Sequence, residues 1–352
     1  MSAKSQLPIL LNILLEAKDG EFKILATDLE IGIEIEIPAN IEEEGSTTVS
    51  AKVFSELITS LPTGRITFIT KENSLEVSTP KTKSSFQTIS AEEFPKLYEE
   101  KGEEAMVIKN EKIQEDFGMV VFCASLDMGR PALSGVLIKE EEAGYVLVAT
   151  DGYRLSLKHY ITEKTQGKKA GFEKPILIPA RAIRELIGLK QDGGDVSMYI
   201  SDKNNQVLFS QENTALVGRL LEAEFPKYER IIPTDFGTKV FFDKEELQKA
   251  VKVCSIFARE TANIVRLAIQ KEKIVVSANT PSVGENMVEV EAKLEGEENA
   301  IAFNARYLLD LFANISQSDM TLEMSGHLNP GVFRIKDDPT FLHLIMPIRV
   351  QE

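Results

Sequence analysis

The sequence predicts an α+β protein of three repeated domains built from antiparallel strands and two helices each, except that the first domain lacks its opening strand and helix. Three observations support this prediction: the length of the chain, a strand motif that recurs, and a helix motif that recurs with nearly the same period. A chain of 352 residues, 43% of them hydrophobic, is too long for one compact core. We therefore expect two or three domains.

The strand motif is an apolar run followed by Ala-Thr-Asp and then by alternating residues. Two copies match closely and a third is weaker: "KILATDLEIGIEIEI", "VLVATDGYRLSLKHY" and "KIVVSANTPSVGENMVEVE". Their alanines, Ala26, Ala149 and Ala278, lie 123 and 129 residues apart. Alternation of apolar and polar residues predicts strands with one face in water.

The helix motif joins Ala, a basic residue, an acid and a Leu within nine residues. Its copies are "SAKVFSELI", "PARAIRELI" and "NARYLLDLF", whose alanines Ala51, Ala180 and Ala305 lie 129 and 125 residues apart. Apolar residues at i, i+3 and i+4 predict a short amphipathic helix with one buried stripe. Each copy follows a β-type run, so the predicted unit is a strand, a helix and then a meander of strands.

A strand and a helix also open the second and third repeats, in "AMVIKNEKIQEDFGMVVFCA" and "KVFFDKEELQKAVKVCSIF". Connectors rich in acids or proline follow the first and second repeats. We predict domain one at 1–102, domain two at 103–234 and domain three at 235–352.

Repeat one is shorter than its sisters at its beginning. It has 25 residues ahead of Ala26, whereas 42 residues separate Val107 from Ala149 in repeat two. We expect domain one to lack the opening strand and most of the opening helix, and we hypothesise that the natural start lies upstream of Met1.

The sequence shows no catalytic constellation. His159, His327 and His343 lie in separate contexts without metal-ligand spacing, and the sequence has no P-loop, no GxGxxG and no nucleophile elbow. Asp28 and Asp151 recur at matched positions, which suits turn-forming residues better than a unique general acid. We predict no catalytic residue, no cofactor and no metal site.

The composition indicates a soluble protein with a large acidic excess. The formal charge of −15 argues against a simple basic DNA-binding domain, although a basic face can lie within an acidic shell. Cys123 and Cys254 lie in apolar contexts that suit reduced core thiols. No apolar run approaches the length of a membrane span, so we expect a cytoplasmic protein without membrane contact.

The chain as a whole resembles the bacterial sliding clamp, the beta subunit of DNA polymerase III. The resemblance rests on the order and spacing of many segments, among them "GRPALSGVLI", "LVATDGYRLS", "EFPKYERIIP", "FNARYLLDLF" and "LIMPIRV". It implies a DNA polymerase processivity factor: a head-to-tail homodimer forming a ring around double-stranded DNA, with sheets outside and helices lining the inner face. A three-repeat peptide-binding scaffold without DNA is the alternative.

The resemblance assigns candidate DNA-facing residues to the helices and to the N-terminus. A clamp holds DNA by topology and needs a mildly basic lining rather than a tight site. The competing interpretation of each residue is a solvated helix face. The candidates are Lys4, Lys52, Lys112, Arg181, Arg184, Lys249, Lys252 and Arg306.

The resemblance also implies a pocket for short linear peptides near the junction of domains two and three. Its expected users are DNA polymerases, the clamp loader, mismatch-repair proteins and ligase. Apolar side chains would accept the peptide's anchors and arginines would orient its polar groups. The pocket residues carried over are Leu133, Thr150, Gly152, Tyr153, Arg154, Leu155, Pro226, Arg230, Ile231, Asn304, Tyr307, Leu344, Met346, Pro347, Ile348 and Arg349.

Subunit contact between domains one and three is expected to use Phe86, Ile256 and Phe257, for each of which a core position is the competing interpretation.

Two departures from the family concern the pocket. Tyr153 stands where a His is frequent, and Gln351 and Glu352 extend the usual end. The first should alter partner affinity modestly, and the second should add negative charge beside the pocket.

Overall fold

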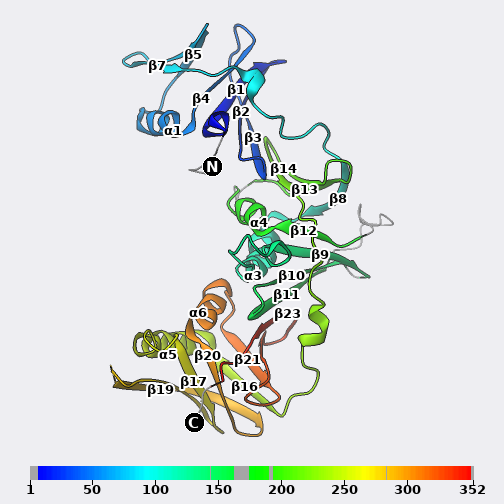
Figure 1. The fold of residues 1–352 in the computed structure, drawn as a ribbon, viewed down its shortest axis with the longest axis vertical. Helices are drawn as coiled ribbons and strands as arrows, with labels where there is room; N and C mark the ends of the chain where they lie inside the picture. The colour runs from blue at the N-terminus through cyan, green and yellow to red at the C-terminus, as the bar shows by residue number, and fades with distance from the viewer. Residues whose placement is uncertain (1–6, 143, 162–173, 190–192, 283, 350–352) are drawn as a thin grey trace. The chain divides into compact units, whose positions relative to one another are not determined.

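The structure, a computed structural model, describes residues 7–142, 144–161, 174–189, 193–282 and 284–349. The chain divides into two compact units (Figure 1). Unit 1 holds residues 1–110 and 188–220, and unit 2 holds residues 111–187 and 221–352. The strands of the middle repeat are shared between the units, and the domain boundaries at 102 and 234 remain a prediction.

Unit 1 contains an eight-stranded antiparallel sheet to which repeats one and two both contribute. Strand β3 of repeat one pairs with β15 of repeat two, with Ile31 opposite Gly218 and Ile35 opposite Thr214. The strands in spatial order are β4 (Gly45–Ser50), β1 (Asn12–Lys18), β2 (Glu21–Thr27), β3 (Ile31–Ile37), β15 (Thr214–Arg219), β14 (Gln206–Gln211), β13 (Val196–Ser201) and β8 (Glu103–Ile108).

Repeat one also contributes a three-stranded sheet of β5 (Thr67–Lys71), β6 (Ser74–Ser78) and β7 (Lys83–Gln87). Helix α1 (Ala51–Ser60) packs on β1 and β4 and buries Phe54. The short η2 (Ala91–Glu93) follows β7. Ahead of β1, the described chain forms the 3-10 turn η1 (Pro8–Leu11), and these residues hold no counterpart of the strand and helix that open the other repeats.

Unit 2 contains a twelve-stranded sheet that runs from repeat two into repeat three. The two repeats join where β11 pairs with β23, with Arg154 opposite Ile345 and Lys158 opposite Phe341. The strands in spatial order are β12 (Ile176–Pro179), β9 (Gly135–Glu141), β10 (Gly144–Thr150), β11 (Arg154–Ile161), β23 (Asp338–Ile345), β22 (Gly331–Ile335), β21 (Asp319–Met324), β16 (Thr238–Asp243), β19 (Gly284–Gly296), β18 (Lys273–Thr280), β17 (Ile264–Ile269) and β20 (Asn299–Asn304).

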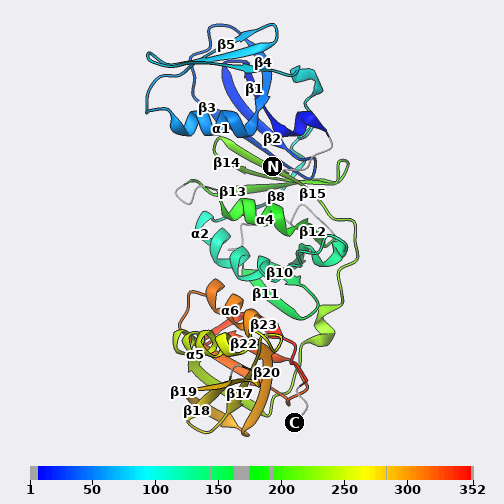
Figure 2. The same ribbon diagram turned by 60° about the vertical axis from the view of Figure 1, so that its left-hand side comes forward.

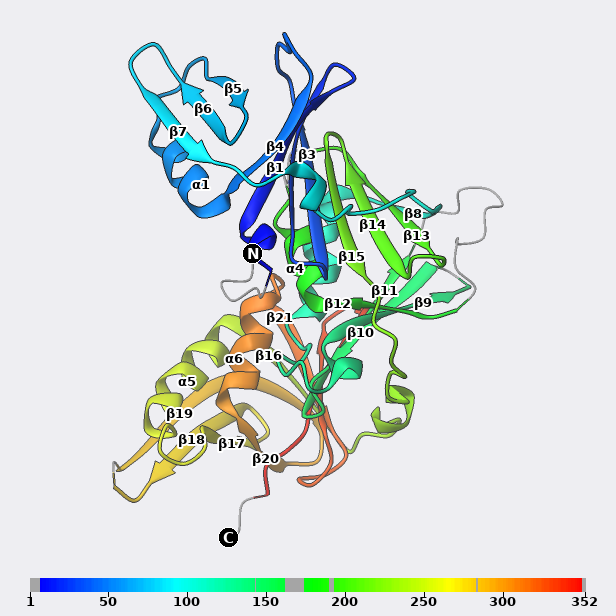
Figure 3. The ribbon, with the colours of Figure 1, turned by 45° about the horizontal axis from the view of Figure 1, so that its top comes forward.

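Helices cover one face of the strands in repeat three, where α5 and α6 lie side by side (Figures 2 and 3). The helix predicted to open repeat two is interrupted by a π-helical turn, which apolar periodicity alone does not reveal. The helical elements that follow repeat one are α2 (Asn110–Lys112), the π turn η3 (Ile113–Phe117), α3 (Gly118–Val121), η4 (Pro131–Leu133), α4 (Ala180–Ile187), η5 (Tyr228–Ile231), α5 (Lys244–Phe257) and α6 (Ala305–Asn314).

Both recurring motifs occupy equivalent places in each repeat. The helix motif forms α1, α4 and α6, each directly after the strand β4, β12 or β20. The strand motif forms the hairpins β2–β3, β10–β11 and β18–β19. The predicted order of strand, helix and meander is confirmed in all three.

The two matched aspartates shape equivalent turns. A side-chain oxygen of Asp28 accepts hydrogen bonds from the backbone N–H groups of Glu30 and Ile31, at 3.1 and 2.9 Å. Asp151 accepts from Tyr153 and Arg154 in the same way, at 2.9 and 3.0 Å. Their interpretation as turn-forming residues is confirmed, because each carboxylate accepts hydrogen bonds from backbone N–H groups of its own turn.

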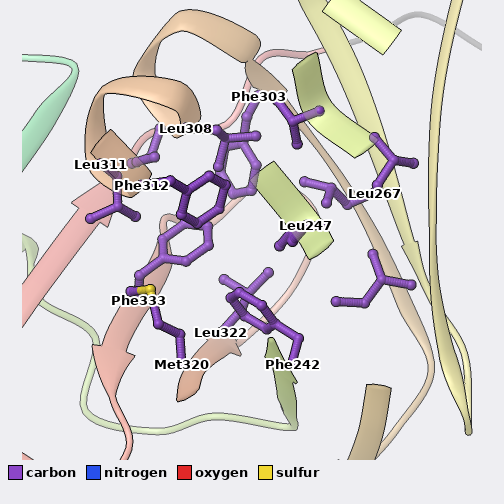
Figure 4. Close-up of a cluster of buried hydrophobic side chains, with 14 of the residues drawn as sticks. Phe242, Leu247, Leu267, Phe303, Leu308, Leu311, Phe312, Met320, Leu322 and Phe333 are labelled. Carbon is purple, nitrogen blue, oxygen red and sulfur yellow. The ribbon is translucent and has the colours of Figure 1, made fainter. Parts of the chain in front are cut away.

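The core of repeat three lies between its helices and the sheet (Figure 4). Phe312 of α6 packs edge-on against Phe333 of β22 and Phe242 of β16, with ring centroids 6.3 and 6.4 Å apart. Leu308 and Leu311 complete the buried stripe of α6. This stripe is the i, i+3, i+4 pattern predicted for the helix motif.

Both cysteines are buried and free of disulfides, as predicted for core thiols. Burial raises the pKa of Cys123 to about 12 and that of Cys254 to about 11. Among the described residues, no helix combines the length and apolar character needed to cross a membrane.

Candidate functional site

The turn between β10 and β11 and the first two residues of β11 form the centre of the expected peptide site. We call this segment, residues 151–155, the lip. The Thr150 hydroxyl donates to the Arg154 carbonyl at 2.7 Å and accepts from the Gly152 N–H at 3.0 Å. Gly152 has φ +91°, a conformation that L side chains rarely adopt. The lip therefore holds a fixed shape, which leaves the Tyr153 side chain 57% exposed.

The C-terminal strand β23 closes one side of the lip. Leu155 pairs with Leu344 across the sheet, and the Met346 N–H donates to the Tyr153 carbonyl at 2.8 Å. Both leucines are buried, whereas Met346 is 38% exposed. The sheet thus brings two segments almost two hundred residues apart into one site.

Arg154 is buried in the middle of the lip, with a side chain 10% exposed. Its Nε donates to Asp151 at 3.1 Å, its Nη1 to Asp310 of α6 at 2.7 Å, and its Nη2 to the Phe122 carbonyl at 3.3 Å. Its guanidinium also lies over the Tyr307 ring, 4.7 Å from the centroid. Since all three nitrogen atoms donate within the chain, Arg154 positions the lip against α6 in this structure.

Aromatic rings extend this arrangement in both directions. On the outer side, Tyr153 stacks on Tyr307 with centroids 6.5 Å apart. On the inner side, Arg154 lies 5.6 Å from the centroid of Phe122, which stacks on His343 at 5.4 Å. A continuous row of stacked groups therefore leads from the exposed Tyr153 to the buried His343.

The inner end of this row holds a buried polar cluster that sequence reasoning did not identify. His343 Nδ1 lies 2.7 Å from the Ser156 hydroxyl, which lies 3.2 Å from the Cys123 sulfur. Burial, assisted by the nearby charge of Arg154, lowers the pKa of His343 to about 3, and the pKa of Cys123 is raised to about 12. Both groups are neutral near pH 7, so the cluster joins β11 to β23 and supplies no activated nucleophile.

The other expected pocket residues divide into core and surface. Leu133 lies on η4 beside Gly152, and Asn304 caps α6 by accepting from the Arg306 N–H at 2.9 Å. Ile231 is 45% exposed at the end of η5. The Ile348 N–H donates to the Ala302 carbonyl at 2.8 Å. Further exposed or half-exposed members are Pro226, Arg230, Pro347 and Arg349.

Four residues around the lip were absent from the sequence prediction: Phe122, Arg130, Asp310 and His343. A Cβ built on Gly152 would lie 4.0 Å from an Arg130 nitrogen, so Arg130 borders the lip. One signal was present in the repeats, because Arg154 stands where repeat one has the apolar Ile31. A buried arginine requires partners, but the sequence does not say which ones.

The expected DNA-facing residues are largely exposed. Lys52, Arg181, Lys249, Lys252 and Arg306 have exposed side chains on their helices.

Two members of that set, Arg184 and Lys112, make local contacts. The Arg184 guanidinium donates to the Val121 carbonyl at 3.4 Å, and burial lowers its pKa. Lys112 pairs with Glu115 at 2.7 Å. Lys4, Gln351 and Glu352 lie outside the described residues.

The three expected interface residues differ in exposure. Phe86 is 9% exposed and packs on Phe54 in the core of repeat one, with centroids 5.8 Å apart. Phe257 is half-buried against the core of repeat three, whereas Ile256 is 53% exposed. Phe86 thus has the core position that was its competing interpretation.

The fold defines a protein made of three copies of one strand–helix–meander unit. Comparison with known families identifies it more closely. Models of the N-terminal, central and C-terminal domains of the DNA polymerase III beta subunit match residues 1–98, 107–227 and 229–349 in order. The chain belongs to this family.

Similar proteins agree along the whole chain. The beta sliding clamp of Staphylococcus aureus is 29% identical over 363 residues, covering 99% of this chain and 94% of that protein. The DNA polymerase sliding clamp of Bacillus subtilis has a TM-score of 0.92 at 27% identity, with 99% and 94% of the two chains covered. The beta subunit of Thermotoga maritima has a TM-score of 0.91 at 27% identity, with 100% and 94% covered.

The function follows from this membership. The chain is a sliding-clamp processivity factor of DNA polymerase, an accessory subunit without catalytic activity of its own.

Proposed function

We propose that two copies of this chain join head to tail into a closed ring around double-stranded DNA, and that the lip docks short linear peptides of partner proteins. The supporting observation for the ring is a pairing rule within the chain. The second strand of the recurring hairpin in one repeat pairs with the last strand of the next repeat, as β3 with β15 and β11 with β23. Both joints are antiparallel and occupy equivalent positions.

Among the described strands, β19 of repeat three and β7 of repeat one do not take part in such a joint. Each is therefore available to pair with a strand of a second copy. Strand β19, the second strand of the hairpin in repeat three, pairs with β18 over 284–291 and with β16 over 292–296. Among the described strands, residues 284–291 of β19 therefore have a partner on one side. Strand β7, the last of repeat one, pairs within its sheet with β6 alone.

Pairing β19 of one copy with β7 of another makes a heterologous interface, which generates a closed ring when the rotation closes. It would also cover two strand edges that would otherwise invite aggregation. Six repeats would then surround the DNA, as the family resemblance implies. Exposed helix residues such as Lys52, Arg181, Lys249 and Arg306 supply positive charge for its lining.

For the lip, the proposed partners are DNA polymerases, the clamp loader, mismatch-repair proteins and ligase-type proteins. Tyr153, Ile231 and Met346 offer exposed apolar surface to the anchors of a peptide. Arg230 and Arg349 are exposed and can orient its carboxylates and carbonyls. We also propose that the protein is cytoplasmic, because the proposed ring acts on chromosomal DNA.

The ring is tested by loading the protein on a nicked circular duplex and raising the salt concentration. A topological clamp stays on the circle at high salt and leaves after linearisation, because it slides off the ends. An electrostatic binder is lost as salt rises, whether or not the DNA is closed. Retention that linearisation does not change would contradict the ring, and peptide binding without any DNA retention would favour the scaffold alternative.

A further inference from the structure

A cavity of about 980 Å³ lies in repeat three, where β19 separates from β16. It is well removed in sequence from the lip and contains none of the expected pocket residues. Its lining is strongly acidic and includes Asp243, Glu246, Glu272, Glu289, Glu291 and Asp319. Two lysines, Lys273 and Lys336, offset only part of this charge.

The β3–β15 and β11–β23 joints within the chain show which structural element lies beside the strand equivalent to β19. At the β3–β15 joint, the tip of the β14–β15 hairpin contacts the end of β3: Asn213 donates through its side-chain amide to the Glu36 carbonyl at 2.6 Å, and its own carbonyl accepts from the Glu36 N–H at 2.8 Å. At the β11–β23 joint, Lys158 of β11 donates to Asp338 and Thr340 of the β22–β23 hairpin, at 3.0 and 2.7 Å. In both joints the tip of the last hairpin contacts β3 or β11, the second strand of the recurring hairpin.

The corresponding hairpin of repeat one is β6–β7, whose loop is residues 79–82. The loop is held in shape by Thr79, whose N–H donates to the Thr82 carbonyl at 2.8 Å and whose hydroxyl accepts from the N–H groups of Lys81 and Thr82 at 3.3 and 3.1 Å. Lys81 is exposed at its tip, and Lys83 is exposed at the start of β7. The hairpin thus carries positive charge in a preformed shape.

The register of β3 on β15 can be carried over to β19 and β7. Ile35, nine residues after Ala26, lies opposite Thr214, the first residue of β15. Ile35 also lies opposite Ile24 of β2, and the counterpart of Ile24 in repeat three, Val276, lies opposite Val288 of β19. By the same register Val288 would lie opposite Lys83, the first residue of β7. The loop that precedes Lys83 would then lie over residues 289–291, which line the acidic cavity.

We infer that the acidic cavity between β16 and β19 receives the β6–β7 loop of a second copy of this chain, with Lys81 paired to the carboxylates of Glu289 and Glu291. This inference rests on the proposed head-to-tail dimer and adds a specific electrostatic contact to it. Opposite charges at an interface favour the correct partner and increase the association rate. The contact also weakens as salt screens it.

Charge reversal on each side tests the contact. Lys81→Glu and Glu291→Lys are each expected to raise the dimer dissociation constant about tenfold at low salt, because each places like charges together. The double variant carries the swapped pair at both interfaces, so its dissociation constant should return close to that of the parent. Lys96→Glu, an exposed lysine outside the hairpin, is the charge-matched control. Dilution series by sedimentation velocity measure all four variants and the parent, and circular dichroism checks their folding.

The outcomes separate this inference from the ring itself. Weakened single variants with a restored double variant support the contact. A dimeric parent whose single variants dimerise as well as the control would overturn the contact and leave the ring standing. Single variants that weaken without restoration in the double variant would overturn the pairing of these residues. A parent that stays monomeric at all concentrations would overturn both the contact and the proposed ring.

Discussion

The two joints within the chain use one backbone arrangement for different purposes. At β3–β15, Ile31, Gly32 and Ile33 face Gly218, Val217 and Leu216. At β11–β23, the equivalent positions begin with Arg154 and continue to Ser156, which faces His343. The strand pairing is the same, so the polar cluster of the second joint is an addition to the architecture rather than a part of it.

The comparison separates the residues of the lip that form the shared turn from those that differ between the two joints. Asp28 and Asp151 form the same turn in both joints. After the aspartate the chains differ, with Leu29-Glu30-Ile31 in one joint and Gly152-Tyr153-Arg154 in the other. The second triplet builds the stacked row toward α6, and this is the part we assign to partner docking.

Removing the arginine that distinguishes the two joints should have the largest effect. Arg154→Ala is expected to destabilise unit 2 by about 3 kcal/mol, because it removes a largely buried cation from two carboxylates and leaves Asp151 without its ion-pair partner. It should also weaken binding of a Gln/Leu/Phe-type peptide at least tenfold by releasing the lip. Denaturant unfolding and peptide anisotropy measure the two effects, with the exposed Arg181→Ala as control. Equal stability of the two variants would contradict the positioning role.

The buried histidine of the second joint predicts sensitivity to acid. The pKa of His343 in the folded chain is about 3, below its ordinary 6.5, so the unfolded chain binds more protons as the pH falls below 6.5. Stability should fall by about 2 kcal/mol between pH 7.5 and pH 5. His343→Gln, which cannot titrate, should lose this part of the pH dependence. If the free energy of unfolding changed equally with pH in the parent and the variant, the assignment of this pH dependence to His343 would be contradicted.

A second buried group near this joint, Asp116, should change the stability in the opposite direction as the pH changes. Lys158 of β11 lies 3.6 Å from Asp116 of the π turn and 3.0 Å from Asp338. Burial raises the pKa of Asp116 to about 6 from 3.8, against the opposing charge of Lys158. The folded chain therefore binds more protons in this range, and stability should decrease by about 1 kcal/mol from pH 5 to pH 7. Asp116→Asn should remove this decrease, and a slope that the substitution leaves unchanged would assign it elsewhere.

The smallest expected effect compares the residue after each aspartate. Leu29 has φ +76° and Gly152 has φ +91°, so both turns need the left-handed region. Leu29 is 54% exposed and contributes little burial. Leu29→Gly should therefore stabilise unit 1 by roughly 0.5 kcal/mol, whereas Gly152→Ala should destabilise unit 2 by about 1 kcal/mol. Thermal unfolding measures both, and a destabilising Leu29→Gly would show that the leucine side chain has a packing role.

Much of the fold was predictable because it repeats. Two motifs with a common period predicted the placement of α1, α4 and α6 after strands and the hairpins that carry Asp28 and Asp151. Local periodicity did not predict the π turn at Ile113–Phe117, which inserts into a helix whose apolar pattern is otherwise ordinary. The sequence also could not predict whether Phe86 lies in the core, since an apolar strand residue can face the core or a partner.

The site was predictable only in part. Tyr153, Arg154 and Met346 came from the family resemblance, and the structure brings them together at β11 and β23. Phe122 and Asp310 were not predicted, since they reach Arg154 from 32 and 156 residues away. Whether these residues bind a peptide remains a prediction for the experiments above.

The sequence by itself determined the repeat, the secondary structure that follows from it and the family, because periodicity, turn residues and motif order are local or additive along the chain. The tertiary structure decided the burial of Arg154 and His343, their altered electrostatics and the acidic cavity beside β19. These properties depend on which distant side chains surround a group, and a pKa or a cavity exists only once those neighbours are in place.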